Sequence, residues 1–152
     1  DTQVATFADR FAQDEGVLIQ ELIENHVEVS CGCLEKKDGK FLELPPIEII
    51  PQVGTFFDYK SKYEKGGSIE RIPAIEISEK LREKISKLSI DIHKLIGCRL
   101  YSRSDFLIKG DEIYYLETNT LPGMTATSLI PQEADAIGVD YTQLISFYID
   151  NS

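Results

Sequence analysis

Basic residues are scarce in this 152-residue sequence, where 16 lysines and arginines stand against 26 aspartates and glutamates. The formal net charge of −10 argues against binding to nucleic acid, which depends on basic side chains that neutralise phosphates. No apolar run reaches the roughly 18 residues that a membrane-spanning helix needs, and no charged-then-apolar leader opens the chain. The sequence therefore predicts a cytoplasmic protein that binds neither nucleic acid nor membrane.

Cysteine is also sparse, with three residues at Cys31, Cys33 and Cys98. An odd count without framework spacing argues against a disulfide scaffold. Cys31 and Cys33 would share one face of a strand, but a zinc site would need a second pair, which the sequence lacks. We expect both to be small buried hydrophobic residues.

No repeat, low-complexity tract or linker divides the chain, so we predict a single domain. Strands and helices mix without strict βαβ alternation, which favours an α+β fold with a largely antiparallel sheet packed with helices. We expect helices at 2–13, 78–97, 128–138 and 140–150, and strands at 17–23, 27–34, 41–50, 69–73, 98–108 and 112–118.

Two local features refine this prediction. The helix at 78–97 has the strongest support, because Ser78 suits its N-cap, Gly97 suits its C-terminus, and its apolar residues recur at helical spacing. Pro45 and Pro46 should break the strand at 41–50 and favour an edge position for it. His93 lies beside the apolar stripe of the helix, which is typical of a structural histidine.

Four polar residues of the expected 98–118 hairpin point to chemistry. Arg103 and Asp105 are two apart on the first strand, and Glu117 and Asn119 are two apart on the second. Because a short turn makes the strands antiparallel neighbours, the three oxygen-bearing side chains can converge beside the arginine. Hard oxygen donors suit magnesium, and an arginine can hold charge that develops on a phosphoryl or carboxyl group. The alternative is a solvent-facing strand pair with ordinary surface charges.

Longer motifs carry a family resemblance. Residues Glu117–Thr125 followed by Ser128–Pro131 resemble the C-terminal signature of D-alanine–D-alanine ligases, which belong to the ATP-grasp superfamily. Arg103–Phe106 resembles the family's Arg-x-Asp motif, and 56–63 resembles its aromatic loop over the active site. The three motifs occur in the family's order, and the resemblance covers roughly residues 17–150. It implies the ATP-grasp C-terminal fold.

The resemblance also implies roles for the hairpin and the segment after it. Asp105, Glu117 and Asn119 would bind two magnesium ions, with Glu117 bridging them and manganese as an alternative metal. Arg103 would stabilise the tetrahedral intermediate, and the backbone N–H of Gly123 would help to form the same oxyanion site.

Substrate and nucleotide residues follow from the resemblance in the same way. Ser128 and Leu129 would lie near the carboxylate of the second D-alanine, and Tyr63 would help to close the site. Backbone groups of one segment would bind adenine, Glu28 would hold the ribose hydroxyls, Lys62 would contact phosphate, and two leucines would pack on the adenine unless they simply fill the core. The residues that the resemblance assigns to ATP are Gln20, Glu21, Leu22, Ile23, Glu28, Lys62, Leu107 and Leu116.

The implied reaction joins two D-alanines for peptidoglycan precursor synthesis. ATP phosphorylates the carboxylate of one D-alanine, and the amine of the second attacks the acyl phosphate, so catalysis rests on positioning and charge neutralisation. A whole ligase of this family also has an N-terminal substrate domain and a first ATP-grasp half. Nothing in 1–152 resembles these parts, so we expect a C-terminal fragment of a longer, homodimeric enzyme that is inactive by itself.

Two alternatives stay open. The chain fits another ATP-grasp carboxylate–amine ligase, such as one that makes D-alanyl-D-lactate or D-alanyl-D-serine, although the Lys62–Tyr63 pair favours the dipeptide. A non-catalytic ATP-grasp-like binding domain is the other alternative. The complete polar set on the hairpin argues against it, because a domain without catalysis has no reason to keep every member.

Overall fold

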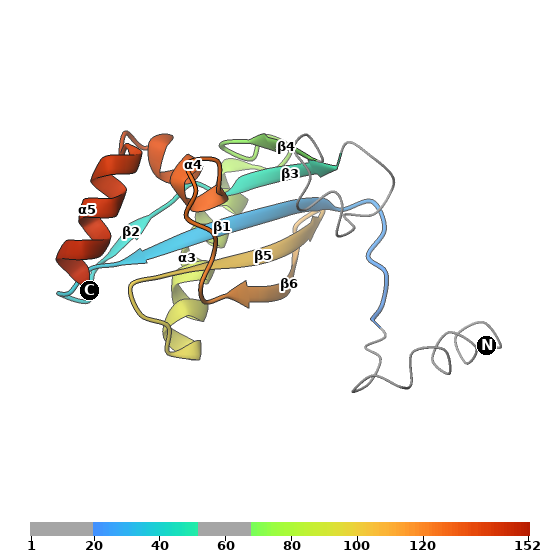
Figure 1. The fold of residues 1–152 in the computed structure, drawn as a ribbon. Coiled ribbons are helices and arrows are strands. Elements are labelled where there is room, and N and C mark those ends of the chain that lie inside the picture. Colours follow the sequence, from blue (N-terminus) through green and yellow to red (C-terminus); the bar gives the residue numbers. More distant parts are fainter. Residues whose placement is uncertain (1–19, 52–67) are drawn as a thin grey trace, which may run out of the picture.

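The computed structural model describes residues 20–51 and 68–152, which form an antiparallel sheet covered by helices (Figure 1). The predicted α+β fold is thereby confirmed. The expected helix at 2–13 and the loop with Lys62 and Tyr63 lie outside the described residues. The elements in chain order are β1 (Val27–Glu35), β2 (Phe41–Glu43), β3 (Ile47–Pro51), β4 (Ser68–Arg71), α3 (Glu79–Ile96), β5 (Tyr101–Lys109), β6 (Glu112–Asn119), α4 (Leu129–Asp135) and α5 (Tyr141–Asn151).

Strand β1 is central to the six-stranded sheet, whose order is β4-β3-β1-β5-β6, with β2 also paired to β1. The predicted break at Pro45 and Pro46 is confirmed, because the two prolines separate β2 from β3. The predicted edge position is wrong for β3, which lies between β4 and β1. The sheet tolerates the prolines because they fall in the gap between the two short strands, where no ladder hydrogen bond is needed.

Helix α3 covers one face of the sheet. Its N-cap Ser78 accepts a hydrogen bond from the backbone N–H of Leu81, and Gly97 ends the helix with a φ of 79°, a left-handed conformation that glycine adopts without strain. The helix therefore spans the range that its caps and apolar stripe predict. Its buried side chains pack against a core cluster made of Val29, Cys31, Ala74, Ile77, Leu81, Ile85, Phe106 and Ile108.

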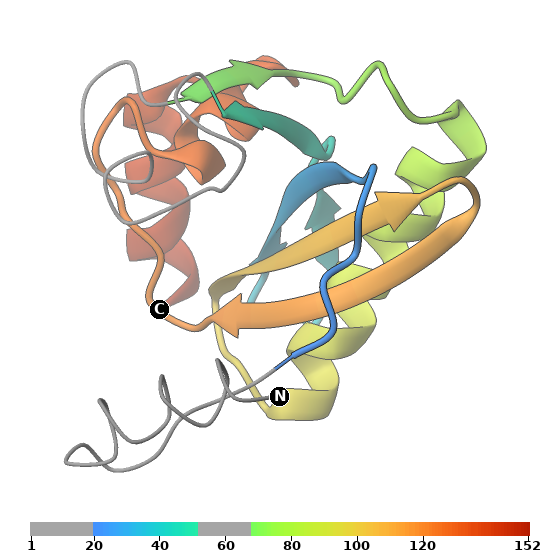
Figure 2. The ribbon, with the colours of Figure 1, turned by 90° about the vertical axis from the view of Figure 1, so that its right-hand side faces the viewer.

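Helices α4 and α5 lie on the opposite side, so that the sheet stands between them and α3 (Figure 2). Asp140 and Gln143 form a reciprocal capping box at the start of α5. Side chains of both helices pack against the end of the sheet in a second cluster, which consists of Leu34, Leu44, Ile130, Ala134, Leu144 and Tyr148. The two helices cover only this end of the face.

Several smaller predictions can be compared with the structure. Cys31 and Cys33 are buried, as expected of small hydrophobic residues. His93 is buried in α3, where its Nδ1 lies 2.7 Å from the Ser102 hydroxyl, so it is a structural histidine as predicted. The described part of the expected 17–23 strand is wrong, because 20–23 pairs with no strand. Within the described ranges, no helix has the length and apolar character to cross a membrane.

Candidate active site

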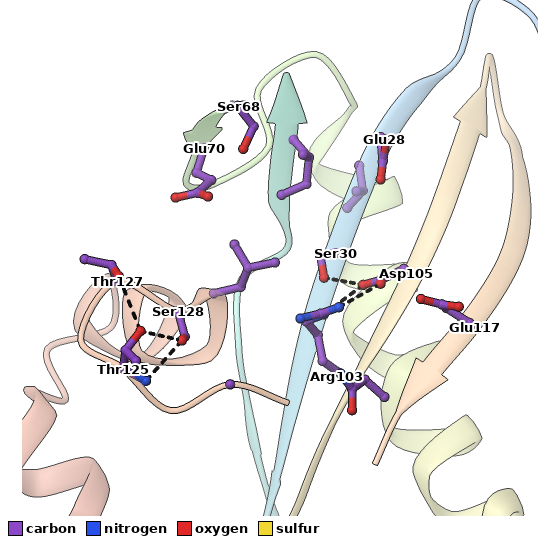
Figure 3. Close-up of a pocket in the computed structure, with 15 residues that line it drawn as sticks. Glu28, Ser30, Ser68, Glu70, Arg103, Asp105, Glu117, Thr125, Thr127 and Ser128 are labelled. Carbon is purple, nitrogen blue, oxygen red and sulfur yellow. Dashed lines mark hydrogen bonds and ion pairs between the residues drawn. The ribbon is translucent and has the colours of Figure 1, made fainter. Parts of the chain in front are cut away.

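A pocket of about 670 Å³ lies on the sheet face opposite α3, where the β5–β6 hairpin approaches the segment before α4 (Figure 3). Eight of the residues singled out in the sequence line it together with side chains that sequence reasoning missed. Those eight are Glu28, Arg103, Asp105, Glu117, Asn119, Gly123, Ser128 and Leu129. The structure thus brings together the residues expected to bind metal, to stabilise charge and to hold the second substrate.

Strand β5 presents the charged pair by simple alternation. Ser102, Ser104 and Phe106 are buried, whereas Arg103 and Asp105 are partly exposed on the other face. Across the hairpin, Asp105 pairs with Glu117 and Arg103 pairs with Asn119. The four polar side chains therefore form two adjacent cross-strand pairs, which lie within interaction distance of each other.

An irregularity in β6 is what turns Glu117 into the pocket. Phe106 pairs with Tyr115, but the next residue of β5, Asp105, pairs with Glu117, so Leu116 is left without a partner in the register. A uniform ladder would place Leu116 opposite Asp105 and Glu117 opposite the buried Ser104. A β-bulge inserts one residue and re-aims the side chains that follow it. The spacing argument from the sequence did not foresee this bulge.

Arg103 and Asp105 form a two-point ion pair. Arg103 donates from Nε to Oδ1 of Asp105 at 3.0 Å and from a terminal nitrogen to Oδ2 at 2.9 Å. The hydroxyl of Ser30 on β1 donates to the same Oδ1. Burial would lower the pKa of Arg103, but Asp105, Glu133 and Glu117 outweigh it and raise the pKa. The guanidinium is therefore held charged and oriented at the pocket wall.

The donor set fits magnesium in kind and position. Asp105, Glu117 and Asn119 offer two carboxylates and an amide oxygen, which are the hard donors that magnesium prefers. The Asn119 Oδ1 accepts a hydrogen bond from the backbone N–H of Leu121 at 3.0 Å, which orients the amide. In the ranges 20–51 and 68–152, no cluster of three His, Cys, Asp or Glu side chains is arranged to hold a metal, and here the third ligand would be the asparagine.

The opposite wall of the pocket is a compact loop that leads into α4. The Ser128 hydroxyl accepts from the backbone N–H of Thr125 at 3.1 Å and lies 2.8 Å from the Thr125 hydroxyl. A Cβ atom on Gly123 would come within 3.0 Å of the same hydroxyl. Gly123 and Ser128 are therefore in contact, and only a residue without a side chain fits at Gly123.

The expected nucleotide residues are more dispersed. Glu28 lines the pocket and pairs in register with Leu107, which follows Arg103 and Asp105 on the same face of β5. Leu116, at the bulge, is 42% exposed. Neither leucine is among the residues that line the pocket, so their proposed contact with adenine is untested.

The segment expected to bind adenine, 20–23, runs without strand pairing beside the hairpin (Figure 2). Its Gln20, Glu21 and Leu22 side chains are exposed and Ile23 is half-buried. Tyr114 on β6 donates to Glu112 at 2.8 Å, and this hydrogen bond raises the pKa of the phenol, with a smaller contribution from the charge of Glu21. The segment therefore lies near β6 but outside the pocket that holds the polar residues.

Sequence reasoning missed several residues at this site. Ser30, Glu70, Thr125 and Thr127 also line the pocket. Ser30 is 2% exposed, and a serine inside an otherwise apolar strand is the signal that might have drawn attention to it. Glu70 accepts a hydrogen bond from Gln132 of α4 at 2.7 Å, a contact between segments 62 residues apart that no local pattern reveals.

Comparison with known proteins agrees with this geometry. A family model described as the C-terminus of D-ala D-ala ligase matches residues 2–150. The chain belongs to this family. It is 48% identical over 143 residues to a D-alanine–D-alanine ligase of Leptospira interrogans, covering 92% of the chain and 40% of that ligase. It is 41% identical over 154 residues to the corresponding ligase of Leptospira biflexa, covering 99% of the chain and 43% of that ligase.

Solved structures show the same similarity. The D-alanine–D-alanine ligase of Bacillus anthracis complexed with ATP aligns with a TM-score of 0.73 at 33% identity, over 99% of this chain and 46% of that one. The VanG D-Ala:D-Ser ligase of Enterococcus faecalis aligns with a TM-score of 0.80 at 30% identity, over 98% of this chain and 43% of that one. The fold is thus that of the C-terminal part of these ligases. The chain spans about two fifths of the length of the relatives it matches.

Proposed function

We propose that this chain is the C-terminal part of an ATP-dependent ligase that joins two D-alanines through an acyl phosphate. One observation carries the proposal: the bulged hairpin and the loop before α4 bring Arg103, Asp105, Glu117 and Gly123 to one pocket. Family membership and the ATP complex of the Bacillus anthracis relative support it. The product would serve peptidoglycan precursor synthesis in the cytoplasm, and the full-length enzyme would be a homodimer.

Each wall of the pocket has its own task in this reaction. Asp105, Glu117 and Asn119 would hold two magnesium ions, or manganese in their place, which neutralise the charge of the transferring phosphoryl group. Arg103 would hold the negative charge on the carbon under attack, together with the backbone N–H of Gly123. These groups bind and orient, and none forms a bond to the substrate.

The loop wall would position the amine of the second D-alanine. Ser128 and Leu129 line the pocket beside Gly123, so a carboxylate bound there would lie close to the oxyanion site. Holding the two reactants in one geometry replaces a bimolecular encounter with an effectively unimolecular step. Lys62 and Tyr63 would contact phosphate and close the site.

ATP would lie along the hairpin. Glu28 borders the pocket and would accept the ribose hydroxyls, while Leu107 and Leu116 would pack against the adenine. Backbone groups of Gln20, Glu21, Leu22 and Ile23 would bind the base edge, as the list from the resemblance requires. This placement would make the phosphates point toward the Asp105–Glu117 pair.

A second candidate differs only in the acceptor. The VanG D-Ala:D-Ser ligase matches this chain with a higher TM-score than the Bacillus anthracis ligase, so D-serine is the competing second substrate. A competition assay with D-alanine and D-serine as acceptors separates the two. A D-lactate acceptor, another ATP-grasp carboxylate–amine ligation and a non-catalytic binding domain remain as less supported alternatives.

The proposal can be tested in a chimera. The part of the Leptospira interrogans ligase that matches this chain is replaced by the chain itself, and dipeptide and phosphate are measured with D-alanine, ATP and magnesium. We expect turnover that depends on magnesium. Glu117→Gln should lower kcat by about 10²–10³-fold, the loss typical of removing one charge-stabilising group.

Glu112→Gln is the matched control, because it makes the same change on the same strand outside the pocket. It should leave kcat within about 2-fold. A folded chimera that binds ATP but makes no dipeptide with any acceptor would refute the ligase proposal. Equal loss in both variants would refute the metal assignment, while leaving the ligase proposal intact.

A further inference from the structure

Strand β1 has a backbone position that the sheet leaves without a partner. On one side of β1, the register with β3 ends at Ser30 and the register with β2 begins at Cys33. Pro45 and Pro46 lie between those two strands. Gly32 therefore faces a gap, and a buried N–H without a hydrogen bond costs about 1–3 kcal/mol.

A carboxylic acid from α4 fills this gap. The N–H of Gly32 donates to both oxygens of Glu133, at 3.2 and 2.9 Å, and Glu133 is fully buried. A Cβ atom on Gly32 would come within 2.5 Å of the Glu133 carboxyl. Glu133 shares its helix face with Ile130 and Ala134 of the second core cluster, a place where an apolar side chain is the ordinary choice.

The same carboxyl lies beside the active-site row of the sheet. Gly32 pairs with Arg103 in register, next to the pair of Ser30 and Asp105. The charge of Glu133 contributes to the raised pKa of Arg103. The carboxyl therefore lies within electrostatic reach of the arginine, although its only hydrogen-bond donor in the described structure is Gly32.

Helix α4 is short and begins directly after the loop wall of the pocket. Ser128 is its N-cap residue, and Glu133 lies one and a half turns further on. Gln132 also ties the helix to the loop, because it donates to the Thr127 carbonyl at 2.9 Å. The Glu133–Gly32 contact thus links the two walls of the pocket through a buried path.

Burial raises the pKa of Glu133 well above its ordinary value, and Asp105 raises it further, whereas Gly32 and Arg103 lower it. Cys31 and Tyr148 face the same carboxyl, since its charge raises the pKa of each. A neutral acid in this place accepts the Gly32 hydrogen bond without drawing the Arg103 guanidinium away from the pocket. Glutamine, which keeps a carbonyl oxygen and the shape, is its closest substitute.

We propose that Glu133 is a positioning residue for the second step of the reaction: through Gly32 it fixes the Gly123–Ser128 loop relative to Arg103. The inference rests on the proposed ligase function. It assigns Glu133 no contact with substrate, so its effect should fall on the acceptor and the attack step. ATP binding along the hairpin should stay as it is.

The test uses the complete ligase, as the chimera or the full-length enzyme that contains this chain. Glu133→Leu fills the same space but leaves the Gly32 N–H unpaired, whereas Glu133→Gln keeps an acceptor. Leu144→Ala is the control for lost stability, because Leu144 is fully buried in the same cluster on α5. Each variant is characterised by its melting temperature, the KM for ATP, the KM for the second D-alanine and kcat.

We expect Glu133→Leu to lower kcat/KM for the second D-alanine by about 10-fold or more, the effect of a positional shift near the reacting groups. The KM for ATP should stay within about 2-fold, and Glu133→Gln should recover most of the loss. The proposal is overturned if Glu133→Leu loses no more than Leu144→Ala, if the KM for ATP changes as much, or if glutamine does not rescue. A parent enzyme without dipeptide activity overturns the ligase proposal itself, whereas an active parent with an indifferent Glu133→Leu overturns only the positioning role.

Discussion

Gly32→Ala should destabilise the protein although alanine suits a strand better than glycine does. The added Cβ would come within 2.5 Å of a Glu133 oxygen and within 2.8 Å of side-chain carbons of both Ile130 and Leu44. Overpacking of this kind costs about 1–3 kcal/mol. Moving Glu133 away leaves the Gly32 N–H buried and unpaired, which costs about 1–3 kcal/mol more.

Relief of the glycine entropy cost offsets this by only about 0.5–1 kcal/mol. The free energy of unfolding should therefore fall by about 2–5 kcal/mol, measured by urea titration of the purified chain. The melting temperature should fall by roughly 4–20 °C, since 1 kcal/mol shifts a chain of this size by about 2–4 °C. Glu43→Ala on the exposed side of β2 is the control and should cost less than about 0.5 kcal/mol. Equal stability of Gly32→Ala and the parent would show that Glu133 does not occupy the space above Gly32.

Three further predictions concern residues outside the pocket. A thiol-alkylating reagent at about pH 8 should modify Cys98 in the folded chain and reach Cys31 and Cys33 only after unfolding, because burial raises the pKa of both buried thiols, that of Cys33 to about 12; mass spectrometry of the labelled peptides checks this. Burial outweighs a nearby carboxylate and lowers the pKa of His93 below its ordinary 6.5, so its stabilising effect is present above that value and is lost as the pH falls; urea midpoints at about pH 5 and about pH 7.5 should differ less in His93→Gln than in the parent. Ser78→Ala removes the N-cap of α3 and should cost about 1 kcal/mol by urea titration, whereas a loss below 0.3 kcal/mol, on the order of experimental error, would mean that the cap contributes little.

Local signals explain which parts of the fold could be predicted. Helix α3 follows from an apolar stripe and from caps at Ser78 and Gly97, all of which lie within one segment. The β5–β6 hairpin follows from a two-residue turn between alternating strands. Because these elements are specified by neighbours in sequence, their bounds differ from the prediction by at most about three residues.

The precise convergence of the site could not be derived from spacing. Counting outward from the turn puts Leu116, not Glu117, opposite Asp105, and only the bulge corrects the count. A bulge depends on how both strands pack against the core, which a pattern of one strand does not contain. The family resemblance supplied the correct grouping because its motifs already carry the consequence of that bulge.

Contacts between distant segments were also beyond the sequence. Glu133 reads as one more surface acid of a short helix, and Gly32 as a flexible residue in a strand. Their contact joins residues 101 positions apart and depends on the gap that Pro45 and Pro46 leave beside β1. Each residue alone has an ordinary explanation, and only their juxtaposition shows why both are needed.

The charge of the pocket connects the composition of the chain with its proposed chemistry. Among the described residues that line it, four carboxylates surround a single guanidinium, and Arg103 is already paired with Asp105. Such a surface repels the phosphates of a nucleotide, because like charges at a few ångströms interact unfavourably even with partial screening. Metal ions bound to Asp105, Glu117 and Asn119 would reverse the sign of the local field. The remaining positive charge must come from parts of the ligase outside the described residues, which is why an acidic chain can form half of a site for ATP.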